Sequence, residues 1–289
     1  MNQRQESERS KSYTWEHQVE TPSEALKNWV CAYRGYRENT EQPICRLEVP
    51  KDRVILILGF GDRLHIHSVG SQSPASQYAA FVAGLGANPL ITEHSGVQRC
   101  LEIELFPWAI HRLFDSAPAE FTQGCIHLED LWGAQAHQLL EHLSEVPTWQ
   151  GRFALVNRVL LEKVAASHAI PRPEIQWAWH HLESHGGCVP IGQLARTIGW
   201  SDRYFAARFR EQVGITPKAA ARRIRFNHAL QLLKGDNPMG LSDIAATCGY
   251  SDQSHFAREF RLFTGCSAKV YQQAHFAGLP GIPGHIVEE

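Results

Sequence analysis

Side chains that can hydrogen-bond to nucleic-acid bases recur at helical spacing in two segments of this 289-residue chain. Arg203 stands in the first segment, and Gln253 and Arg258 stand in the second. An arginine can donate two hydrogen bonds to the edge of a guanine, and a glutamine can pair with an adenine in the same way. Such side chains reach base edges when a helix carries them into the major groove, so the neighbouring residues must supply that helix.

The two segments are copies of one motif. An internal repeat is the first feature to establish, because it determines which folds are considered. Residues 191–202 match residues 241–252 at an offset of 50. The matched pairs are Ile191/Leu241, Leu194/Ile244, Ala195/Ala245, Thr197/Thr247, Gly199/Gly249, Trp200/Tyr250, Ser201/Ser251 and Asp202/Asp252. After one extra residue in the second copy, the matches are Phe205/Phe256, Phe209/Phe260, Arg210/Arg261 and Gly214/Gly265.

Each copy predicts a helix, a short turn and a second helix. Gly199 and Gly249 stand where a helix ends in a left-handed residue without a Cβ atom. Ser201 and Ser251 follow as N-caps of the next helix, and each precedes an aspartate that suits its first turn. The phenylalanine pairs at i and i+4 give that second helix a buried face. A helical hairpin of this form is the unit whose second helix reads the major groove.

The segment between the copies predicts a basic helix from Pro217 to Leu233, because proline favours the first helical turn. A helix of about 17 residues measures roughly 25 Å, which can hold two recognition helices about one DNA turn apart. The alternative is a helical-repeat protein with two hairpins. Such arrays need three or more copies to build a continuous core, and this sequence shows two.

These segments together resemble the DNA-binding domain of the AraC/XylS family of bacterial transcription regulators. The resemblance covers roughly residues 173–273, and one departure is Ala268, where the family usually has proline. It rests on Leu194-Ala195, Gly199-Trp200-Ser201, Phe205 to Arg210, Gly214 to Pro217, Arg225 to Leu233, Ile244-Ala245, Cys248 to Phe256, Phe260-Arg261 and Gly265 to Ala268. The resemblance implies double-stranded DNA as a partner and regulation of transcription as the function.

Helical position and the resemblance together nominate the DNA-contacting residues. The expected base-reading residues are Arg203, Ala206, Ala207, Gln253, Ser254 and Arg258. The expected phosphate contacts are Arg210, Lys218 and Arg261, together with Ser201 and Ser251 as caps that present backbone N–H groups. Alanine can touch a thymine methyl group but offers no side-chain hydrogen bond, so we expect the second motif to carry more of the polar readout.

Charge and cysteine usage fit a soluble intracellular regulator. The net charge of −2 divides into about +5 over residues 172–275 and −7 over the remainder, and phosphate neutralisation requires such a basic half. The seven cysteines are scattered and form no Cys-x-x-Cys pair, which indicates reduced thiols. The polar N-terminus is no signal peptide, and no apolar run is long enough to span a bilayer. We therefore expect a cytoplasmic, nucleoid-associated protein.

The first half predicts a different architecture. Short apolar or alternating runs between Ile44 and Leu105 are separated by glycine and proline, which is typical of a small antiparallel barrel or sandwich, with a cupin-like barrel as one form. Helices are expected at 108–113, 131–143 and 150–166. The expected class is α+β: a disordered tail (1–12), a β-rich sensor domain with trailing helices (13–169), a linker (170–173), an all-α domain with two helix-turn-helix motifs (174–275) and a C-terminal tail (276–289).

Two histidines raise the question of chemistry in the first half. His65 and His67 alternate along an expected strand, so both imidazoles point to one face as metal ligands would. The cupin motif next requires a glutamate, but Ser71 and Gln72 stand there instead, and two imidazoles alone make a poor catalytic site. We therefore expect a solvated strand face, no cofactor and no enzyme activity. The alternative is a metal-dependent cupin-type enzyme fused to a DNA-targeting module.

The partners of the first half stay open at this point. A small molecule or another protein could modulate DNA binding through it, and its helices at 131–143 and 150–166 carry apolar stripes that could pair two copies or simply pack on the barrel. RNA polymerase is a further candidate partner, because the resembling proteins regulate transcription. The other alternative is a constitutive DNA binder whose first half only dimerises.

Overall fold

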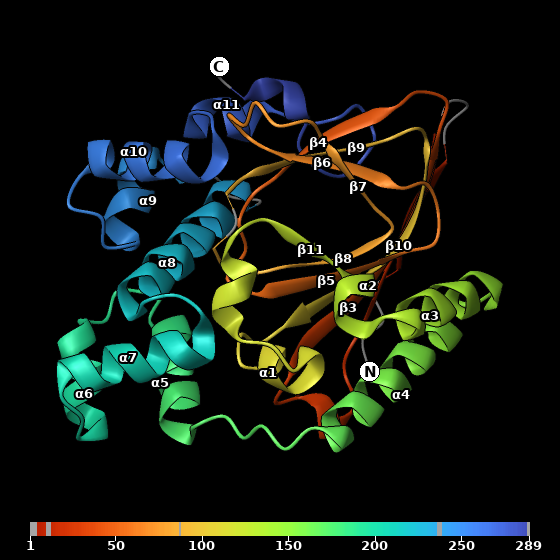
Figure 1. Ribbon diagram of the computed structural model, residues 1–289. Helices are drawn as coiled ribbons and strands as arrows, with labels where there is room; N and C mark the ends of the chain where they lie inside the picture. The colour runs from red at the N-terminus through yellow and green to blue at the C-terminus, as the bar shows by residue number, and fades with distance from the viewer. Residues whose placement is uncertain (1–4, 10–12, 87, 236–238, 288–289) are drawn as a thin grey trace.

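The computed structural model describes residues 5–9, 13–86, 88–235 and 239–287, and it has the α+β architecture that the sequence predicts (Figure 1). Two antiparallel sheets form the first half, and helices form the second. The large sheet has the order β1 (Gln5–Arg9), β2 (Tyr13–Glu20), β3 (Val30–Thr40), β10 (Val97–Leu105), β5 (Val54–Gly59), β8 (Ala80–Ala83) and β11 (Cys125–His127). The small sheet has the order β4 (Ile44–Glu48), β9 (Leu90–His94), β6 (Leu64–Ser68) and β7 (Ser76–Tyr78).

The large sheet is covered on both faces, but by different layers. Leu56 and Leu58 on β5 are fully buried in the core shared with the helices, whereas Ile55 and Ile57 point to a cavity near the small sheet. This alternation follows from the pleat, which sends successive side chains to opposite faces. The continuous aliphatic run of β5 is therefore buried on both sides, as its sequence predicts.

Four α-helices follow β10, with β11 between the first two: α1 (Ala109–Phe114), α2 (Leu128–Trp132), α3 (Ala134–Glu145) and α4 (Trp149–Ala166). The prediction of one helix over 131–143 was wrong, because Gly133 has φ 56° and ψ −137° and separates α2 from α3. A left-handed backbone of this kind suits glycine, so the break has a local cause. The Trp132 indole then donates to the carbonyl of Leu113, 2.9 Å away, which fixes α2 on α1.

The predicted disordered tail over residues 1–12 was also wrong in part. Residues 5–9 form β1, which pairs with β2 from Gln5 opposite Gln18 to Arg9 opposite Thr14. Backbone hydrogen bonds to a neighbouring strand stabilise even a polar segment, and side-chain patterning cannot show this. Residues 1–4 and 10–12 of that prediction lie outside the described residues.

The second half is helical, and its linker is longer than predicted. Residues 167–172 connect α4 to the next helix, which begins at Pro173, a favoured first-turn residue. The helices are α5 (Pro173–Ser184), α6 (Ile191–Ile198), α7 (Asp202–Val213), α8 (Pro217–Lys234), α9 (Leu241–Thr247), α10 (Gln253–Thr264) and α11 (Ala268–Gln273). Figure 1 shows α8 running between the pair α6–α7 and the pair α9–α10.

The segment expected as a C-terminal tail returns to the β-sheets over its described part, residues 276–287. Leu47 N–H on β4 donates to the carbonyl of Ile282 at 2.8 Å, and the indole of Trp15 donates to the carbonyl of Gly278 at 3.0 Å. Arg46 donates to the carbonyl of Pro280 at 3.2 Å. We call residues 276–287 the C-terminal strap, since they tie the last helix of one half to β4 of the other.

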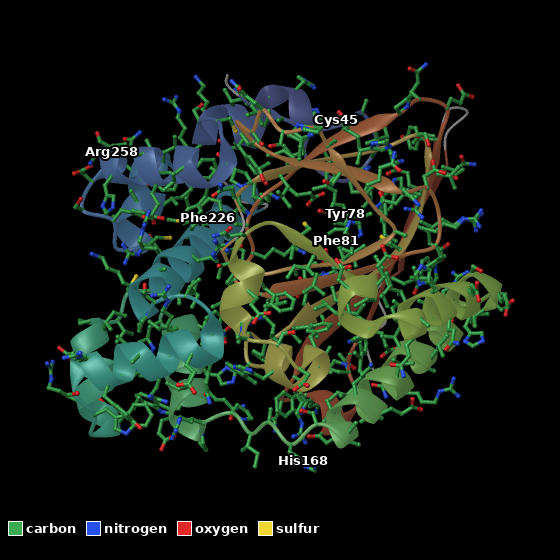
Figure 2. All side chains as sticks on the ribbon, viewed as in Figure 1. Cys45, Tyr78, Phe81, His168, Phe226 and Arg258 are labelled. Carbon is green, nitrogen blue, oxygen red and sulfur yellow. The ribbon has the colours of Figure 1, made fainter. Side chains whose placement is uncertain are left out.

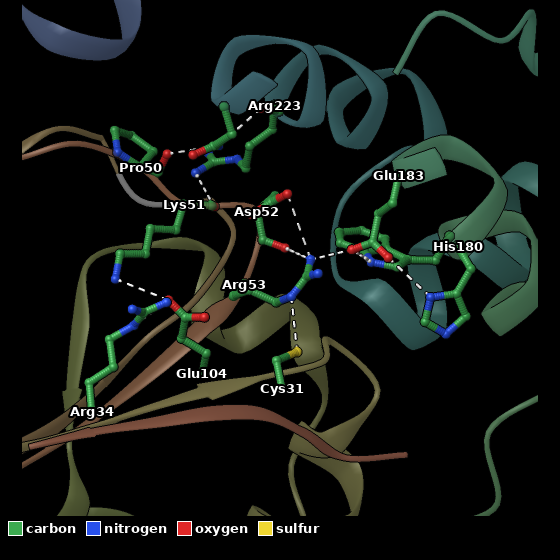
Figure 3. A network of polar contacts seen from close by, with 12 residues as sticks. Cys31, Arg34, Pro50, Lys51, Asp52, Arg53, Glu104, His180, Glu183 and Arg223 are labelled. Carbon is green, nitrogen blue, oxygen red and sulfur yellow. Dashed lines mark hydrogen bonds and ion pairs between the residues drawn. The ribbon is translucent and has the colours of Figure 1, made fainter. Parts of the chain in front are cut away.

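A second contact between the halves centres on Arg53, in the loop between β4 and β5 (Figure 3). The Arg53 guanidinium forms an ion pair with Glu183 on α5 and donates to the thiol of Cys31 at 3.0 Å. Two residues of α5 also bond to the Glu183 carboxylate: the Trp179 indole donates to one oxygen at 2.7 Å, and His180 lies 3.0 Å from the other. Burial would raise the pKa of Glu183, but the bond to His180, the charge of Arg53 and the bond from Trp179 hold it below its ordinary value.

The same loop also contacts α8 through its backbone. Asn227 donates to the carbonyl of Pro50 at 3.2 Å, and Arg223 donates to the carbonyl of Lys51 at 3.3 Å. Arg223 is buried, which lowers its pKa to about 10, so it still carries its charge at neutral pH. No helix in the described part of the chain is both long and apolar enough to cross a bilayer.

We predict that Glu183→Gln loosens the contact between the two halves, because Arg53 loses the counter-charge that compensates its burial. A loss of about 1–3 kcal/mol is expected for a hydrogen bond to a charged group. Thermolysin should then cleave the linker faster before Ile170, whose side chain is 83% exposed. Glu174→Gln, on the first turn of the same helix, is the control. Equal cleavage rates in both variants and the wild type would contradict the role of this ion pair.

The lowered pKa of Glu183 also sets a pH dependence. A carboxylate whose pKa is lower in the folded protein stabilises the fold fully above the ordinary glutamate pKa, and this contribution is lost as the pH falls through the lowered value. Linker cleavage by an acid-active protease should therefore rise on acidification in the wild type. The Glu183→Gln variant should lack this step, and an identical pH profile would contradict the prediction.

Candidate nucleic-acid interface

The first helix-turn-helix is formed by α6 and α7. Gly199 ends α6 with φ 80°, and the hydroxyl of Ser201 accepts a hydrogen bond from the N–H of Tyr204 as the N-cap of α7. Phe205 and Phe209 are fully buried, and Phe209 stacks on Trp179 of α5. The opposite face of α7 therefore has to point outward, as the sequence predicts.

The second helix-turn-helix, α9 and α10, repeats this geometry with one difference. Gly249 has φ 67°, and Phe256 and Phe260 are fully buried. The predicted cap at Ser251 was wrong: the carboxylate of Asp252 accepts from the N–H of His255 at 2.7 Å and caps α10. The extra residue of the second copy moves the helix start by one position, so the aspartate takes the place of the serine.

The structure places the predicted base-reading residues on the outward faces of α7 and α10. Arg203 and Ala207 are exposed and Ala206 is half-buried on α7, whereas Gln253 and Arg258 are exposed on α10, next to an exposed Ser254. Figure 2 shows Arg258 on the outer side of α10, away from the sheets. The three residues of α7 and the three residues of α10 lie at opposite ends of α8.

One of these residues is already oriented. The Ser242 hydroxyl on α9 donates to the side-chain carbonyl oxygen of Gln253 at 2.7 Å. This bond fixes the amide so that its NH₂ group is free to donate, and it links the first helix of the motif to the reading helix. Pre-orientation lowers the entropy that a flexible glutamine would lose on binding.

The predicted phosphate contacts surround these faces. Arg210 and Arg261 are exposed near the ends of α7 and α10, and Lys218 is exposed in the first turn of α8. Ser201 and Ser251 are exposed as well, but the Ser251 hydroxyl bonds to Asp252 and His255 instead of capping the helix. The N-cap of α10, which the sequence analysis assigned to Ser251, is therefore Asp252.

A buried carboxylate holds the second motif on α8. Glu259 accepts from Arg222 at 2.7 Å with one oxygen and from the Tyr250 hydroxyl at 3.1 Å with the other. Glu259 is only 6% exposed, so both bonds form where water competes little. The three residues come from α10, α8 and the turn of the motif, which fixes the reading helix relative to the helix that spaces the two motifs.

Comparisons with known proteins agree with this geometry. A family model described as a helix-turn-helix domain matches residues 194–274. The probable transcriptional regulator LumQ of Photobacterium leiognathi is 34% identical over 29% of this chain and 34% of its own length. The transcriptional activator RhaR of Yersinia pseudotuberculosis is 35% identical over 60% of this chain and 64% of its own length. The chain thus spans about a third to two thirds of the length of these relatives.

Residues 194–274 form a helix-turn-helix domain of the AraC type. A solved structure of ToxT from Vibrio cholerae matches over 83% of this chain and 97% of that chain, with 11% identity and a TM-score of 0.47. At that score the likeness adds nothing to the assignment, which rests on the match over residues 194–274 and the repeated motif.

The first half holds a site that the sequence analysis missed. A cavity of about 470 Å³ is lined by both sheets, by the loop between β4 and β5, and by Pro280 and Gly281 of the C-terminal strap. Its wall is charged: Glu48, Lys51 and Glu102 contribute to it. The sequence of β10 alternates between charged and apolar residues. This alternation predicts a strand, but it does not tell whether the charged face points to solvent or into a cavity. Only the sheet pairing shows that this face points inward.

A buried polar cluster adjoins the cavity. Glu38 accepts hydrogen bonds from Arg46 and Tyr36, and its other carboxylate oxygen lies 3.1 Å from His94. Burial would raise the pKa of Glu38, but the bond to His94 and the charge of Arg46 hold it below its ordinary value. We call the half of the chain that holds the two sheets the β-domain. Because Arg46 also donates to Pro280, this cluster connects the interior of the β-domain to the C-terminal strap, which follows the helix-turn-helix domain.

The two histidines considered as metal ligands lie on β6. Their neighbours Leu64 and Ile66 are buried, so His65 and His67 share the other face of the strand, where His65 is exposed and His67 half-buried. Over the residues that the structure describes, no three His, Cys, Asp or Glu side chains gather closely enough to hold a metal ion. The geometry therefore supplies no third ligand for this pair.

We predict that the serine substitution destabilises the first motif, whereas in the second motif the aspartate substitution matters more. Ser201→Ala should lower the free energy of unfolding by about 1 kcal/mol, as for a typical N-cap, because the Tyr204 N–H loses its acceptor. In the second motif Asp252→Ala should destabilise more than Ser251→Ala, because the aspartate makes the cap. Urea unfolding of the three variants measures this, and a larger loss for Ser251→Ala would contradict the assigned caps.

Proposed function

We propose that this protein is a sequence-specific DNA-binding transcription regulator whose α7 and α10 enter successive major grooves of one DNA site. The observation that carries the proposal is the placement of two exposed reading faces at opposite ends of a single buried helix, α8. Eighteen residues at 1.5 Å each span about 27 Å, which suits two grooves about 34 Å apart once the reading helices extend beyond it.

The contacts divide into readers and positioners. Arg203, Gln253, Ser254 and Arg258 carry hydrogen-bonding groups for base edges, whereas Ala206 and Ala207 offer only methyl contact. The second motif therefore supplies more of the polar readout. Arg210, Lys218 and Arg261, with the N-terminal turns of α7 and α10, act on phosphates, where charge fixes register without reading sequence. The names of LumQ and RhaR, which describe regulators of transcription, agree with this role.

The β-domain acts in this proposal as a sensor whose ligand occupies the cavity between the sheets. Support comes from the wall itself, because Pro280 and Gly281 reach it from the AraC-type half of the chain. A ligand there would contact both halves at once. It could change their docking only by binding one arrangement more tightly than another, and the effect on DNA affinity cannot exceed that difference in binding free energy.

Further partners belong to the same proposal. Half-buried Leu155 and Val159 on α4 flank a groove between α3 and α4, which would let two copies pair through these helices. The protein would act on the nucleoid in the cytoplasm and contact RNA polymerase there. Paired copies would place four reading helices on DNA, and this would raise affinity by increasing the effective concentration of the second copy.

We predict that selection from a random DNA pool by the full-length protein enriches two half-elements about one turn apart. Arg258→Ala should cost about 1–3 kcal/mol at one base pair and relax the preference there. Lys218→Ala should weaken all sites equally and reduce the slope of affinity against salt by about one ion. Failure of folded protein to enrich any sequence would contradict the proposal, and so would equal losses at every base for Arg258→Ala.

A further inference from the structure

One ionisable group in the cavity wall lacks a partner. Glu48, the last residue of β4, pairs with Leu90 of β9 through its backbone and lines the cavity, but its carboxylate forms no hydrogen bond or ion pair with any residue that the structure describes. Its side chain is reachable from the cavity, yet the protein around it raises its pKa by burial, which the charge of Lys51 offsets only in part. A carboxylate in such surroundings gains most from a cation that comes within bonding distance.

The cationic side chains of the cavity wall are already paired. Lys51 lies 2.7 Å from Glu102 and 3.4 Å from Glu104, and Arg34 lies 3.3 and 3.2 Å from the same two carboxylates. Glu48 and Glu102 line the cavity, and Glu104, two residues further along β10, pairs with the same cations. This group therefore holds three carboxylates against the two cations Lys51 and Arg34. The surplus charge is negative, and Glu48 is the group that carries it.

The other lining cations do not change this balance. Arg46 is bound by Glu38, and Arg53 is bound by Glu183 and lies 3.7 Å from Asp52. An anionic ligand would compete with the carboxylates that already hold these guanidinium groups. A cationic ligand would break none of these pairs, because it meets the carboxylate that has no partner.

The remainder of the cavity is apolar. Ile55, Ile57, Leu64, Phe81 and Leu90 line it from the two sheets. Figure 2 shows Phe81 and its neighbour Tyr78 between the sheets, and their ring centroids lie 5.3 Å apart. A volume of about 470 Å³ accommodates a small organic molecule, and an apolar or aromatic body would be buried against these side chains.

We propose that the cavity binds a small organic amine, with its ammonium group paired with Glu48 and its apolar body packed between the two sheets. This inference rests on the proposed function, since it names the chemical class of the ligand that the sensor half would detect. Glu48 also adjoins Leu47 and Arg46, which hold the C-terminal strap. The ligand thus binds at the strand that connects the two halves.

The experiment compares three probes of similar size and different charge: 2-phenylethylamine, 2-phenylethanol and 3-phenylpropanoate. Calorimetric titration of the full-length protein at neutral pH should show binding of the amine and preference over both other probes. Glu48→Gln should weaken the amine by about 10- to 100-fold, as expected for a lost bond to a charged group, and leave the alcohol unchanged. Glu93→Gln makes the same change at an exposed position of the same sheet that does not line the cavity, and should have no effect.

Three results would overturn the proposal: preference for the propanoate or the alcohol, equal loss of amine binding in both variants, or no binding of any probe by the wild type. Glu48→Lys provides a further check, since reversal of the charge should shift the preference toward the propanoate. DNA binding by the same samples is measured in parallel. If the wild type binds DNA but no amine, only the ligand assignment is contradicted. If the wild type shows no sequence-specific DNA binding, the proposed function is contradicted.

Discussion

The buried helix α8 is the constraint on which the arrangement of this protein depends. Phe226 and Ala229 in its middle are fully buried, and the helix is started by the Thr216 cap and Pro217 at its first turn. One side of it receives the loop between β4 and β5 through Arg223 and Asn227. Any bend or shortening of α8 would change the spacing of the two motifs and the docking of the sensor half together.

The two faces of the large sheet in the β-domain have different neighbours. Leu101 and Ile103 of β10 pack with the helices, which leaves Cys100 and Glu102 to face the small sheet. The larger apolar core lies between the large sheet and the helices, and a smaller apolar cluster packs between the two sheets beside the cavity. The ion pairs of the cavity wall leave the Glu48 carboxylate without a bonded partner, and the proposed preference for a cationic ligand rests on this asymmetry.

The two halves contact each other at two places, which are built from different kinds of bond. The loop contact combines the ion pair between Arg53 and Glu183 with side-chain bonds from α8, whereas the C-terminal strap is held by a backbone hydrogen bond from Leu47 on β4. Substitution of side chains does not remove a backbone hydrogen bond. The strap is also bound by the side chain of Arg46, which belongs to the polar cluster beside the cavity. Because the loop and the strap both line the cavity, a change there can reach either contact.

The sequence predicted the helix-turn-helix repeat well, because glycine turns and phenylalanine pairs are local signals that appear twice. It failed where a single position decides between two geometries: Gly133 broke a helix, and Asp252 replaced Ser251 as a cap. It also missed features that depend on pairing over long distances, such as β1 and the C-terminal strap. The cavity escaped notice because an inward charged face and a solvated one have the same alternation.

Hydroxyl-radical footprinting of the full-length protein on its selected site tests the central claim most directly, since it maps backbone protection at single-nucleotide resolution. If α8 holds two reading helices on one face of the duplex, one copy should protect two patches about 10 base pairs apart, and Arg258→Ala should weaken one patch more than the other. A single protected patch, or two patches on opposite faces of the helix, would contradict the account.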